Sequence, residues 1–449
     1  MKSSEVIENL KRRYPGQPEY IQAVSQVLPT IEETYNQHPE FEKVNLIERL
    51  CIPDRIYQFR VTWVDDKGKV QINNGYRVQH NNAIGPYKGG IRFHSSVNLG
   101  ILKFLAFEQT FKNSLTTLPM GGAKGGSDFS PRGKSNAEIM RFCQAFMIQL
   151  HRYIGATIDV PAGDIGTGGR EIGYMYGAYK RLTTRYEGVL TGKGLTYGGS
   201  LARTEATGYG TVYFTDAMLK DRGDSLKGKK CAVSGSGNVA IYCCEKLIQL
   251  GATPVTVSDS NGTIYDPNGI KVDVLKQVKE VERARLTRYA ELVPTAQYTP
   301  VDKYPAGKHQ VWTYNVDCAF PCATQNELNE EDAKTLLANG CKVVAEGANM
   351  PSTLGAIDQF LKAKIAYGPA KAANAGGVAT SQLEMEQNAG MTAWTFEEVD
   401  QKLHTIMTNL YKNVADTARE FGVEGNLVLG ANIAGFRKVA DAMIAQGVI

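Results

Sequence analysis

Residues 229–240 read KKCAVSGSGNVA, and this stretch decides the fold. Its first half is a short apolar run typical of a buried strand. Gly235 and Gly237 then form a tight turn, and a helical pattern follows over Ala240–Leu250. A second apolar run at Pro254–Asp259 predicts the next strand. Strand, glycine turn, helix and strand together make a β-turn-α-β unit, which is the building block of a doubly wound parallel sheet.

The glycine turn also has the chemistry of a dinucleotide site. Gly235 permits the tight turn, Gly237 lets a pyrophosphate approach the backbone, and Ala240 lets the helix pack closely on the sheet. The first turn of that helix would face the pyrophosphate. An ordinary βα turn is the alternative, but Asp259 at the end of the second strand favours dinucleotide binding. ATP chemistry is disfavoured, because Thr191–Gly194 (TGKG) lacks the glycine spacing and the hydroxyl of a Walker A loop.

The neighbours of Asp259 bear on the choice between NAD and NADP. An acid at a strand end usually binds the ribose 2′-hydroxyl of NAD. Here Ser258 and Ser260 flank the acid and offer hydroxyl groups to a 2′-phosphate. Three arginines follow, which form either part of a phosphate site or a solvated basic helix face: Arg283, Arg285 and Arg288. We predict NADP as the cofactor, with NAD less favoured.

Later apolar runs at Gln310–Val316 and Lys342–Glu346 predict further strands, so residues 201–424 are expected to form a Rossmann-type domain. Residues 1–200 are organised differently. Helical patterns fill the first 50 residues, and alternating apolar and polar residues at 56–64 and 70–80 predict two half-buried strands. The fold class is therefore α/β with two domains.

Two further helices are predicted at the ends of these domains. A capping box at Ser135–Glu138 opens a helix in the first domain. The chain is helical again from Phe396, and we expect the final helix, residues 425–449, to return to the N-terminal domain.

Composition excludes several classes of function. The 50 basic and 46 acidic residues are mixed along the chain and leave a net charge of +4, which does not favour nucleic acid. No stretch approaches the ~20 apolar residues of a membrane span, and the N-terminus lacks the apolar core of a signal peptide. The eight cysteines form no CxxC pair and the six histidines no metal-ligand set, so we expect free thiols in the cytoplasm and no metal.

The segment Pro119–Gly126 (PMGGAKGG) sets Lys124 among four glycines. A solvated turn with an incidental lysine is the simple interpretation. A lysine that is instead desolvated in a glycine loop has a lowered pKa and can act in acid-base chemistry. Asp164, which lies between glycines in PAGDIG, can accept and return protons, although aspartates near glycine often form Asx turns or helix caps.

Two more lysines are candidates for binding carboxylates as point charges. Lys88 lies in GPYKGG, and Lys112 lies on a helix predicted at 102–115. Gln109 precedes Lys112 by three residues and shares its helix face. A surface pair between Glu108 and Lys112 is the structural alternative.

Four motifs taken together resemble the glutamate dehydrogenases. They are PYKGGIR at Pro86–Arg92, GGAKGG at Gly121–Gly126, PAGD at Pro161–Asp164 and AEGAN at Ala345–Asn349. The resemblance extends over essentially the whole chain and is close to the hexameric enzymes of this length. The SGSGNVA turn followed by Ser258–Ser260 is similar to the NADP-dependent members.

The resemblance implies reversible oxidative deamination of L-glutamate to 2-oxoglutarate and ammonium with NADP(H), in a cytoplasmic homohexamer whose N-terminal domain binds substrate and mediates oligomerisation. It implies catalytic roles for Lys124 and for Asp164 as a proton shuttle. The implied substrate-binding residues are Lys88 and Ser381 for the side-chain carboxylate and Gln109, Lys112 and Gly163 for the main-chain carboxylate. The implied cofactor-binding residues are Thr207, Gly235, Gly237, Asn238, Val239, Ser258, Asp259, Ser260, Asn349 and Asn374.

Three alternatives stay open at this point. Leucine and phenylalanine dehydrogenases are related, but an unpaired Lys88 ammonium beside an apolar substrate side chain would be costly. A catalytically inactive nucleotide-binding regulator would be expected to lack Lys124 or Asp164. A Schiff-base or PLP enzyme would use a lysine without needing a dinucleotide fold.

Overall fold

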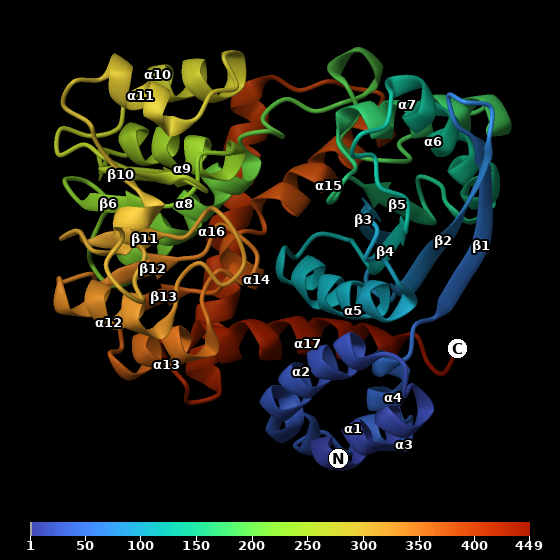
Figure 1. Ribbon diagram of the computed structural model, residues 1–449. Helices are drawn as coiled ribbons and strands as arrows, with labels where there is room; N and C mark the ends of the chain where they lie inside the picture. The colour runs from blue at the N-terminus through green and yellow to red at the C-terminus, as the bar shows by residue number, and fades with distance from the viewer. Residues whose placement is uncertain (1) are drawn as a thin grey trace. The chain divides into compact units, whose positions relative to one another are not determined.

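The computed structural model describes residues 2–449 and divides the chain into two compact units (Figure 1). Unit 1 comprises the chain up to Leu201 with the segments 380–399 and 432–449, and unit 2 comprises 202–379 and 400–431. The segment 380–399, which the sequence analysis places in the second domain, therefore lies in unit 1.

In the described part of unit 1, seven α-helices precede residue 201 and the strands form one mixed sheet. The helices are α1 (Ser3–Arg13), α2 (Pro18–Asn36), α3 (Pro39–Lys43), α4 (Leu46–Cys51), α5 (Leu99–Leu115), α6 (Asn136–Leu150) and α7 (Gly169–Thr183). The strands are β1 (Arg55–Val64), β2 (Val70–Asn81), β3 (Tyr87–Phe93), β4 (Gly122–Ser127) and β5 (Asp159–Ala162). Three long C-terminal helices follow unit 2's strands: α15 (Gly376–Ala389), α16 (Phe396–Glu420) and α17 (Leu427–Ala445).

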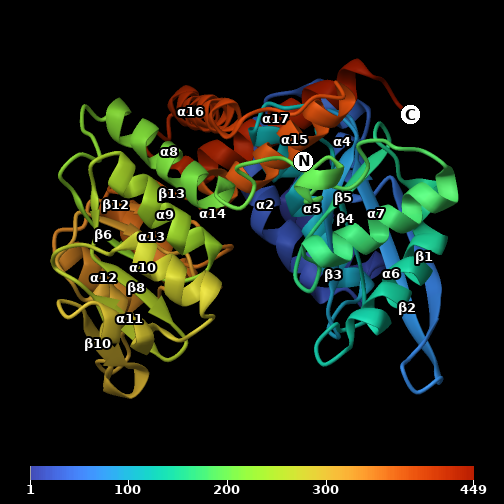
Figure 2. The same ribbon diagram turned by 90° about the horizontal axis from the view of Figure 1, so that it is seen from above.

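The sheet of unit 1 has the order β1-β2-β4-β3-β5. The β1-β2 and β2-β4 pairs are antiparallel, and the β4-β3 and β3-β5 pairs are parallel. Aromatic residues of α6 and α7 pack on one face of the sheet, where Phe93 of β3 meets Phe142 and Phe146. Figure 2 shows α6 and α7 side by side there. Helix α5 covers β2 and β4.

A second core in unit 1 joins the two ends of the chain. Tyr20 and Leu28 of α2 and Phe107 of α5 belong to one buried cluster with Phe436 and Val439 of α17. The predicted return of the C-terminal helix to the N-terminal part of the chain therefore has a direct basis in packing from residue 432 onward.

Side-chain caps explain where two of the unit 1 helices begin. The side chain of Asn98 accepts a hydrogen bond from the backbone N–H of Ile101, so α5 starts at Leu99, three residues before the predicted start. Ser135 and Glu138 form the predicted capping box at the start of α6.

Unit 2 is built around a parallel sheet. Its helices before α15 are α8 (Ala206–Asp221), α9 (Asn238–Gln249), α10 (Val272–Lys276), α11 (Leu286–Leu292), α12 (Glu330–Ala338), α13 (Leu354–Lys362) and α14 (Ala370–Ala373). Its strands are β6 (Lys230–Val233), β7 (Thr253–Pro254), β8 (Thr256–Asp259), β9 (Gly262–Tyr265), β10 (Gln297–Pro300), β11 (Cys318–Phe320), β12 (Val343–Ala345) and β13 (Ala366–Gly368).

The parallel sheet has the order β13-β12-β11-β6-β7, with α8 and α9 on one side and α12 and α13 on the other (Figure 1). Strand β7 lies on one side of β6 and β11 on the other, so the direction of winding reverses between β6 and β11. In doubly wound folds the crevice beyond the carboxyl ends of two such strands is the usual ligand site. The predicted Rossmann-type fold is confirmed.

Two strand predictions in unit 2 need correction. The predicted strand at Pro254–Asp259 is divided: β7 joins the parallel sheet, while β8 pairs with β9 in a separate antiparallel sheet of order β10-β9-β8. The predicted strand at Gln310–Val316 is wrong. Residues Gln310–Trp312 form a 3₁₀ turn that buries Trp312, whose indole N–H donates to the carbonyl of Glu327, and the strand forms later as β11.

His80 is a buried histidine with one unsatisfied nitrogen. Its Nε2 lies 2.9 Å from the carbonyl of Leu50, while Nδ1 has no hydrogen-bond partner among the described residues. Burial lowers the pKa of His80 to about 4, the hydrogen bond to Leu50 opposes this, and the charge of Lys103 adds to it. Protonation would place a charged, unpaired N–H in the core.

We therefore expect stability to fall as the pH drops from about 6.5, the usual pKa of an unfolded histidine, towards 4. The sign follows because the unfolded chain binds the proton first. One pKa unit corresponds to about 1.4 kcal/mol, so the loss approaches about 3 kcal/mol at pH 4. Melting temperatures at pH 7.5 and 5.0 should differ less in His80→Gln than in the native chain. The exposed His94→Gln serves as the control, and equal acid sensitivity in all three proteins would contradict the prediction.

Among residues 2–449, no helix is long and apolar enough to cross a membrane, and no group of His, Cys, Asp and Glu side chains could hold a metal ion. All eight cysteines are buried free thiols.

Candidate active site

Lys124 and Asp164 lie in direct contact in unit 1. Lys124 is on β4, and its Nζ donates to Oδ1 of Asp164 at 2.7 Å. Arg92 at the end of β3 donates its Nε to Oδ2 of the same carboxylate at 2.6 Å. The Lys124 side chain is only 6% exposed, whereas that of Asp164 is 20% exposed and so remains within reach of water or a ligand. One carboxylate is thus shared between two cations, each on its own oxygen.

The electrostatics of this group suit proton transfer. Burial lowers the pKa of Lys124 against the opposing effect of the Asp164 carboxylate, and the charges of Arg92 and Arg77 lower it further. Burial alone would raise the pKa of Asp164, but Lys124 and Arg92 together outweigh burial and bring it below the usual value. Lys124 is thereby closer to losing its proton, while Asp164 stays a carboxylate and an acceptor.

The glycines around Lys124 form a strand and not the predicted loop. Residues 122–127 are β4, and all six are buried between β2 and β3. Gly90 on β3 shows why glycine is needed: a Cβ there would lie 2.8 Å from both the Asp164 side chain and the Gly163 carbonyl, and 3.2 Å from Lys124 Nζ. The missing side chain at Gly90 leaves the space in which these groups meet.

A buried ion pair next to this group holds the backbone of β3. Arg77 of β2 bonds both oxygens of Asp159 at 2.5 and 2.9 Å, and both side chains are fully buried. The guanidinium also donates to the carbonyls of Gly89 and Gly90. Sequence reasoning missed Arg77, because an arginine inside an alternating strand gives no signal of its own. It also missed Arg92 as a site residue, although Arg92 lies in a motif that the resemblance used.

Lys88 is buried, and its Nζ donates to the hydroxyl of Thr191 at 2.7 Å. The backbone of Lys88 is tied to α5: Asn113 donates its amide to the Lys88 carbonyl at 3.2 Å and to the Gly121 carbonyl at 2.6 Å. Gln109, one turn earlier on α5, donates to Asn113 Oδ1 at 2.6 Å. Asn113 therefore connects two of the predicted substrate residues, and neither Asn113 nor Thr191 was predicted.

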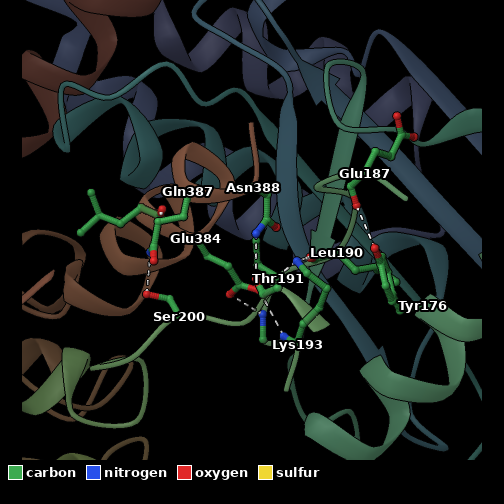
Figure 3. A network of polar contacts seen from close by, with 12 residues as sticks. Tyr176, Glu187, Leu190, Thr191, Lys193, Ser200, Glu384, Gln387 and Asn388 are labelled. Atoms are coloured by element: carbon green, nitrogen blue, oxygen red, sulfur yellow. Dashed lines mark hydrogen bonds and ion pairs between the residues drawn. The ribbon is translucent and has the colours of Figure 1, made fainter. Parts of the chain in front are cut away.

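The remaining predicted substrate residues lie on three elements of unit 1. Lys112 is half-buried on α5, and Gly163 lies in the exposed turn that carries Asp164. Ser381 is buried on α15, whose later residues contact the loop that contains Thr191 (Figure 3).

Seven of the ten predicted cofactor-binding residues line one cavity of about 1220 Å³ in unit 2. Its lining includes the turn Gly235–Val239, the segment Ser258–Ser260, and the segment Cys322–Glu327 with Asn329. The first segment follows β6 and the last follows β11, so the cavity lies at the point where the sheet reverses its winding. A Cβ added at Gly237 would meet nothing within 4 Å, and α9 begins directly after this glycine. The turn therefore has open space for a pyrophosphate at a helix N-terminus.

The carboxylate of Asp259 is turned towards its own backbone. Oδ1 accepts from the N–H groups of Asn261 at 2.8 Å and Gly262 at 3.2 Å, and Oδ2 accepts from Leu286 at 3.0 Å. Arg285 donates to the Ser260 hydroxyl at 2.9 Å. This arrangement places the Arg285 cation at the end of β8, beside a carboxylate that already accepts three backbone N–H groups.

The other predicted cofactor residues are not among those that line this cavity. Asn374 donates to Asn349 Oδ1 at 2.8 Å and to the Ala348 carbonyl at 3.1 Å, so these two asparagines lie together. Thr207, near the start of α8, lies beside Gly377, where a Cβ would come within 2.7 Å of its hydroxyl.

Two titratable groups at the cavity were not predicted. Burial raises the pKa of Glu327 to about 7, opposed by hydrogen bonds from Ser234 and from two backbone N–H groups. His309 bonds to the buried Asp332 at 2.6 Å, and this bond raises the pKa of His309. Neither residue belongs to a motif recognisable in a single sequence.

Two models of known protein families match this chain. The family model described as "Glutamate/Leucine/Phenylalanine/Valine dehydrogenase" matches residues 198–447, and the model of its dimerisation domain matches residues 53–181. The chain belongs to the glutamate/leucine/phenylalanine/valine dehydrogenase family. The predicted membership is confirmed.

Members of this family resemble the chain over its full length. An NAD(P)-specific glutamate dehydrogenase of Xylanibacter ruminicola is 65% identical, with 100% of each chain covered. An NADP-specific glutamate dehydrogenase of Helicobacter pylori is 62% identical, with 99% of each covered. The solved structure of Plasmodium falciparum glutamate dehydrogenase 2 superposes with a TM-score of 0.95 at 50% identity, covering 100% of this chain and 97% of that one.

Proposed function

We propose that this chain catalyses the reversible oxidative deamination of L-glutamate to 2-oxoglutarate and ammonium, with NADP(H) as the preferred coenzyme. The reaction is the one that the full-length relatives are named for. The observation that carries the residue-level proposal is the buried Lys124 that shares the Asp164 carboxylate with Arg92.

The Gly235–Val239 turn and the N-terminus of α9 would hold the coenzyme's pyrophosphate, since Gly237 leaves the backbone open there. The coenzyme supplies the hydride acceptor at the substrate Cα. The protein supplies orientation, and its cationic side chains fix the two carboxylates of glutamate.

Lys124 and Asp164 handle the protons of the deamination. Once hydride has left Cα of the neutral amine, the substrate is an iminium ion. Lys124, in its neutral form, takes a proton from the water whose oxygen adds to Cα, which gives a carbinolamine. Asp164 accepts the proton of the carbinolamine hydroxyl and returns it to the nitrogen, and the C–N bond breaks to give 2-oxoglutarate and ammonia. The ammonia takes the proton that Lys124 removed from water, which gives ammonium and restores neutral Lys124. Arg92 holds Asp164 in place through the second oxygen.

Lys88 and Ser381 are proposed to select the distal carboxylate. Replacing Lys88 by Leu and Ser381 by Val removes a charge-assisted bond of about 1.5–3 kcal/mol and a hydroxyl bond. We expect kcat/KM for glutamate to fall at least tenfold, and that for norvaline, which has a methyl group in place of the distal carboxylate, to rise relative to it. If glutamate keeps its full advantage in the double variant, the distal carboxylate is bound elsewhere.

NADP preference is proposed from the end of β8. Both carboxylate oxygens of Asp259 accept hydrogen bonds from backbone N–H groups, and Arg285 donates to the hydroxyl of Ser260. In an assay of 2-oxoglutarate and ammonium, kcat/KM should be higher with NADPH than with NADH. Arg285→Gln should lower the NADPH value by about tenfold and barely change the NADH value.

Arg288→Gln is the matched control for this prediction, because Arg288 is already paired with Glu282 and Glu291. A clear preference of the native enzyme for NADH would show that Asp259 binds the 2′-hydroxyl and that Arg285 belongs to a solvated face.

We also propose a homohexamer that works in the cytoplasm. The family resemblance supports it, as does the dimerisation-domain model that matches residues 53–181. Light scattering on the purified protein measures the mass directly, and a monomeric mass would refute the assembly.

A further inference from the structure

A buried ion pair outside the proposed catalytic group joins α15 to the loop 186–200 (Figure 3). Lys193 Nζ lies 2.9 Å from Glu384 Oε1, and both side chains are 1% exposed. Burial lowers the pKa of Lys193, and the Glu384 carboxylate opposes this effect. An ion pair so deeply buried is weak evidence for stability, because desolvation offsets its attraction. A contribution to stability therefore does not explain why the Lys193–Glu384 pair is buried at this position.

Glu384 does more than neutralise Lys193. Its Oε2 accepts from the backbone N–H of Gly192 at 2.9 Å, and its Oε1 accepts from the backbone N–H of Lys193 at 3.2 Å. The Lys193 ammonium in turn donates to the carbonyl of Leu190. The pair thus holds the backbone on both sides of Thr191.

Thr191 itself lies between two residues in the left-handed region. Leu190 has φ of 62° and Gly192 has φ of 86°. A left-handed leucine is unfavourable and persists only where its surroundings impose it. The N–H of Thr191 donates to the Pro161 carbonyl at 2.9 Å, and its hydroxyl accepts from Lys88. The hydroxyl that meets the Lys88 ammonium is therefore fixed by contacts from α15 and from β5, and not by the intrinsic preference of the loop.

We propose that the Lys193–Glu384 pair is a positioning device for the distal-carboxylate pocket. It imposes the left-handed turn that presents Thr191 to Lys88, and so sets the direction in which Lys88 offers its charge to the substrate. Ser381 lies one helical turn before Glu384 on α15, so one helix carries both a proposed substrate residue and the anchor of the loop. The inference rests on the proposed role of Lys88 and Ser381.

The test uses ligands that differ in the distal carboxylate. Glutarate, a dicarboxylate that cannot react, reports binding through its inhibition constant, and norvaline reports turnover without a distal carboxylate. In Glu384→Gln, the KM of glutamate and the inhibition constant of glutarate should rise at least tenfold. The KM of the coenzyme and the kcat/KM for norvaline should change by less than about threefold.

A second variant guards against a simple loss of folding. Lys193→Met with Glu384→Leu replaces the ion pair by apolar side chains of similar size, which buried pairs often tolerate. Its melting temperature should stay close to the native value, yet glutarate should still bind weakly, because the backbone N–H groups of Gly192 and residue 193 have lost their acceptor. Native glutarate binding in this folded double variant would overturn the proposal.

Asn388→Ala is the matched control. Asn388 also lies on α15 and anchors the same loop, but at the Gly198 carbonyl, 2.8 Å away and beyond the left-handed turn. The Asn388→Ala variant should have a lower melting temperature but an unchanged inhibition constant for glutarate. Equal weakening by Asn388→Ala and Glu384→Gln would mean that the pair only stabilises the loop, which refutes the positioning role.

Lys88→Leu separates this inference from the proposed function. If Lys88→Leu weakens the binding of glutarate and Glu384→Gln does not, the positioning role of the Lys193–Glu384 pair is refuted, but Lys88 keeps its proposed role in the distal-carboxylate pocket. If Lys88→Leu leaves glutarate unaffected, the pocket assignment itself fails.

Discussion

Lys124→Ala is expected to lower kcat for glutamate oxidation by about 10³-fold or more, because it removes the base that activates water. The coenzyme should bind with native affinity, measured by the quenching of protein fluorescence, since Lys124 lies on β4 of unit 1 and the dinucleotide cavity lies in unit 2. Lys134→Ala is the matched control, because Lys134 is exposed in the loop that follows β4.

Lys124→Arg separates the two properties of this residue. Arginine keeps a cation beside Asp164 but does not lose its proton in proteins. If the cationic charge alone were needed, Lys124→Arg would retain substantial activity. We expect it to be about as inactive as the alanine variant, and near-native turnover in either would remove Lys124 from the mechanism.

Asp164→Asn is expected to lower kcat by about 10²–10³-fold with little change in the KM of glutamate. Asparagine has nearly the same shape but cannot accept the proton from the carbinolamine, and its amide cannot bridge Lys124 and Arg92 as a carboxylate does. The substrate carboxylates are bound by other side chains in our proposal, so affinity should survive.

The residual activity of Asp164→Asn carries a second signature. In the native chain the Asp164 carboxylate opposes the lowering of the Lys124 pKa by burial. Without that carboxylate the Lys124 pKa drops further, so Lys124 loses its proton at lower pH. The acid limb of the kcat/KM profile should therefore move to lower pH. A profile that keeps its native position, or turnover close to native, would contradict the proposed shuttle.

Much of the fold was predictable because its signals are local. The turn at Gly235–Val239 combines an apolar strand, two glycines and a helix start, and each of these depends on neighbouring residues alone. The capping box at Ser135 is equally local. The strand predicted at Gln310–Val316 was wrong because a short apolar run does not distinguish a strand from other buried segments. Here Val311 and Trp312 are buried in the core from a 3₁₀ turn.

The candidate site shows the same limit. Lys124 and Asp164 stand out among glycines, and the structure brings them within 2.7 Å. The sequence did not reveal three further site residues, because each contacts a residue that is distant in sequence. They are Arg92 on β3, Asn113 on α5 and Thr191 in the loop after α7. The role of Gly90 also needed the fold, because the atoms that exclude a side chain there come from β4 and from the turn at 163–164.

The packing of α17 has a consequence for how the chain matures on the ribosome. Helices α2 and α3 bury Tyr35 and Phe41 against Phe436 of α17, which is synthesised only after unit 2. During translation α2 and α3 must wait for α17, and the apolar surface that α17 covers stays exposed while unit 2 is made. Exposed surface of this kind favours aggregation. Nascent chains stalled before residue 432 should therefore need chaperone protection that the released protein does not.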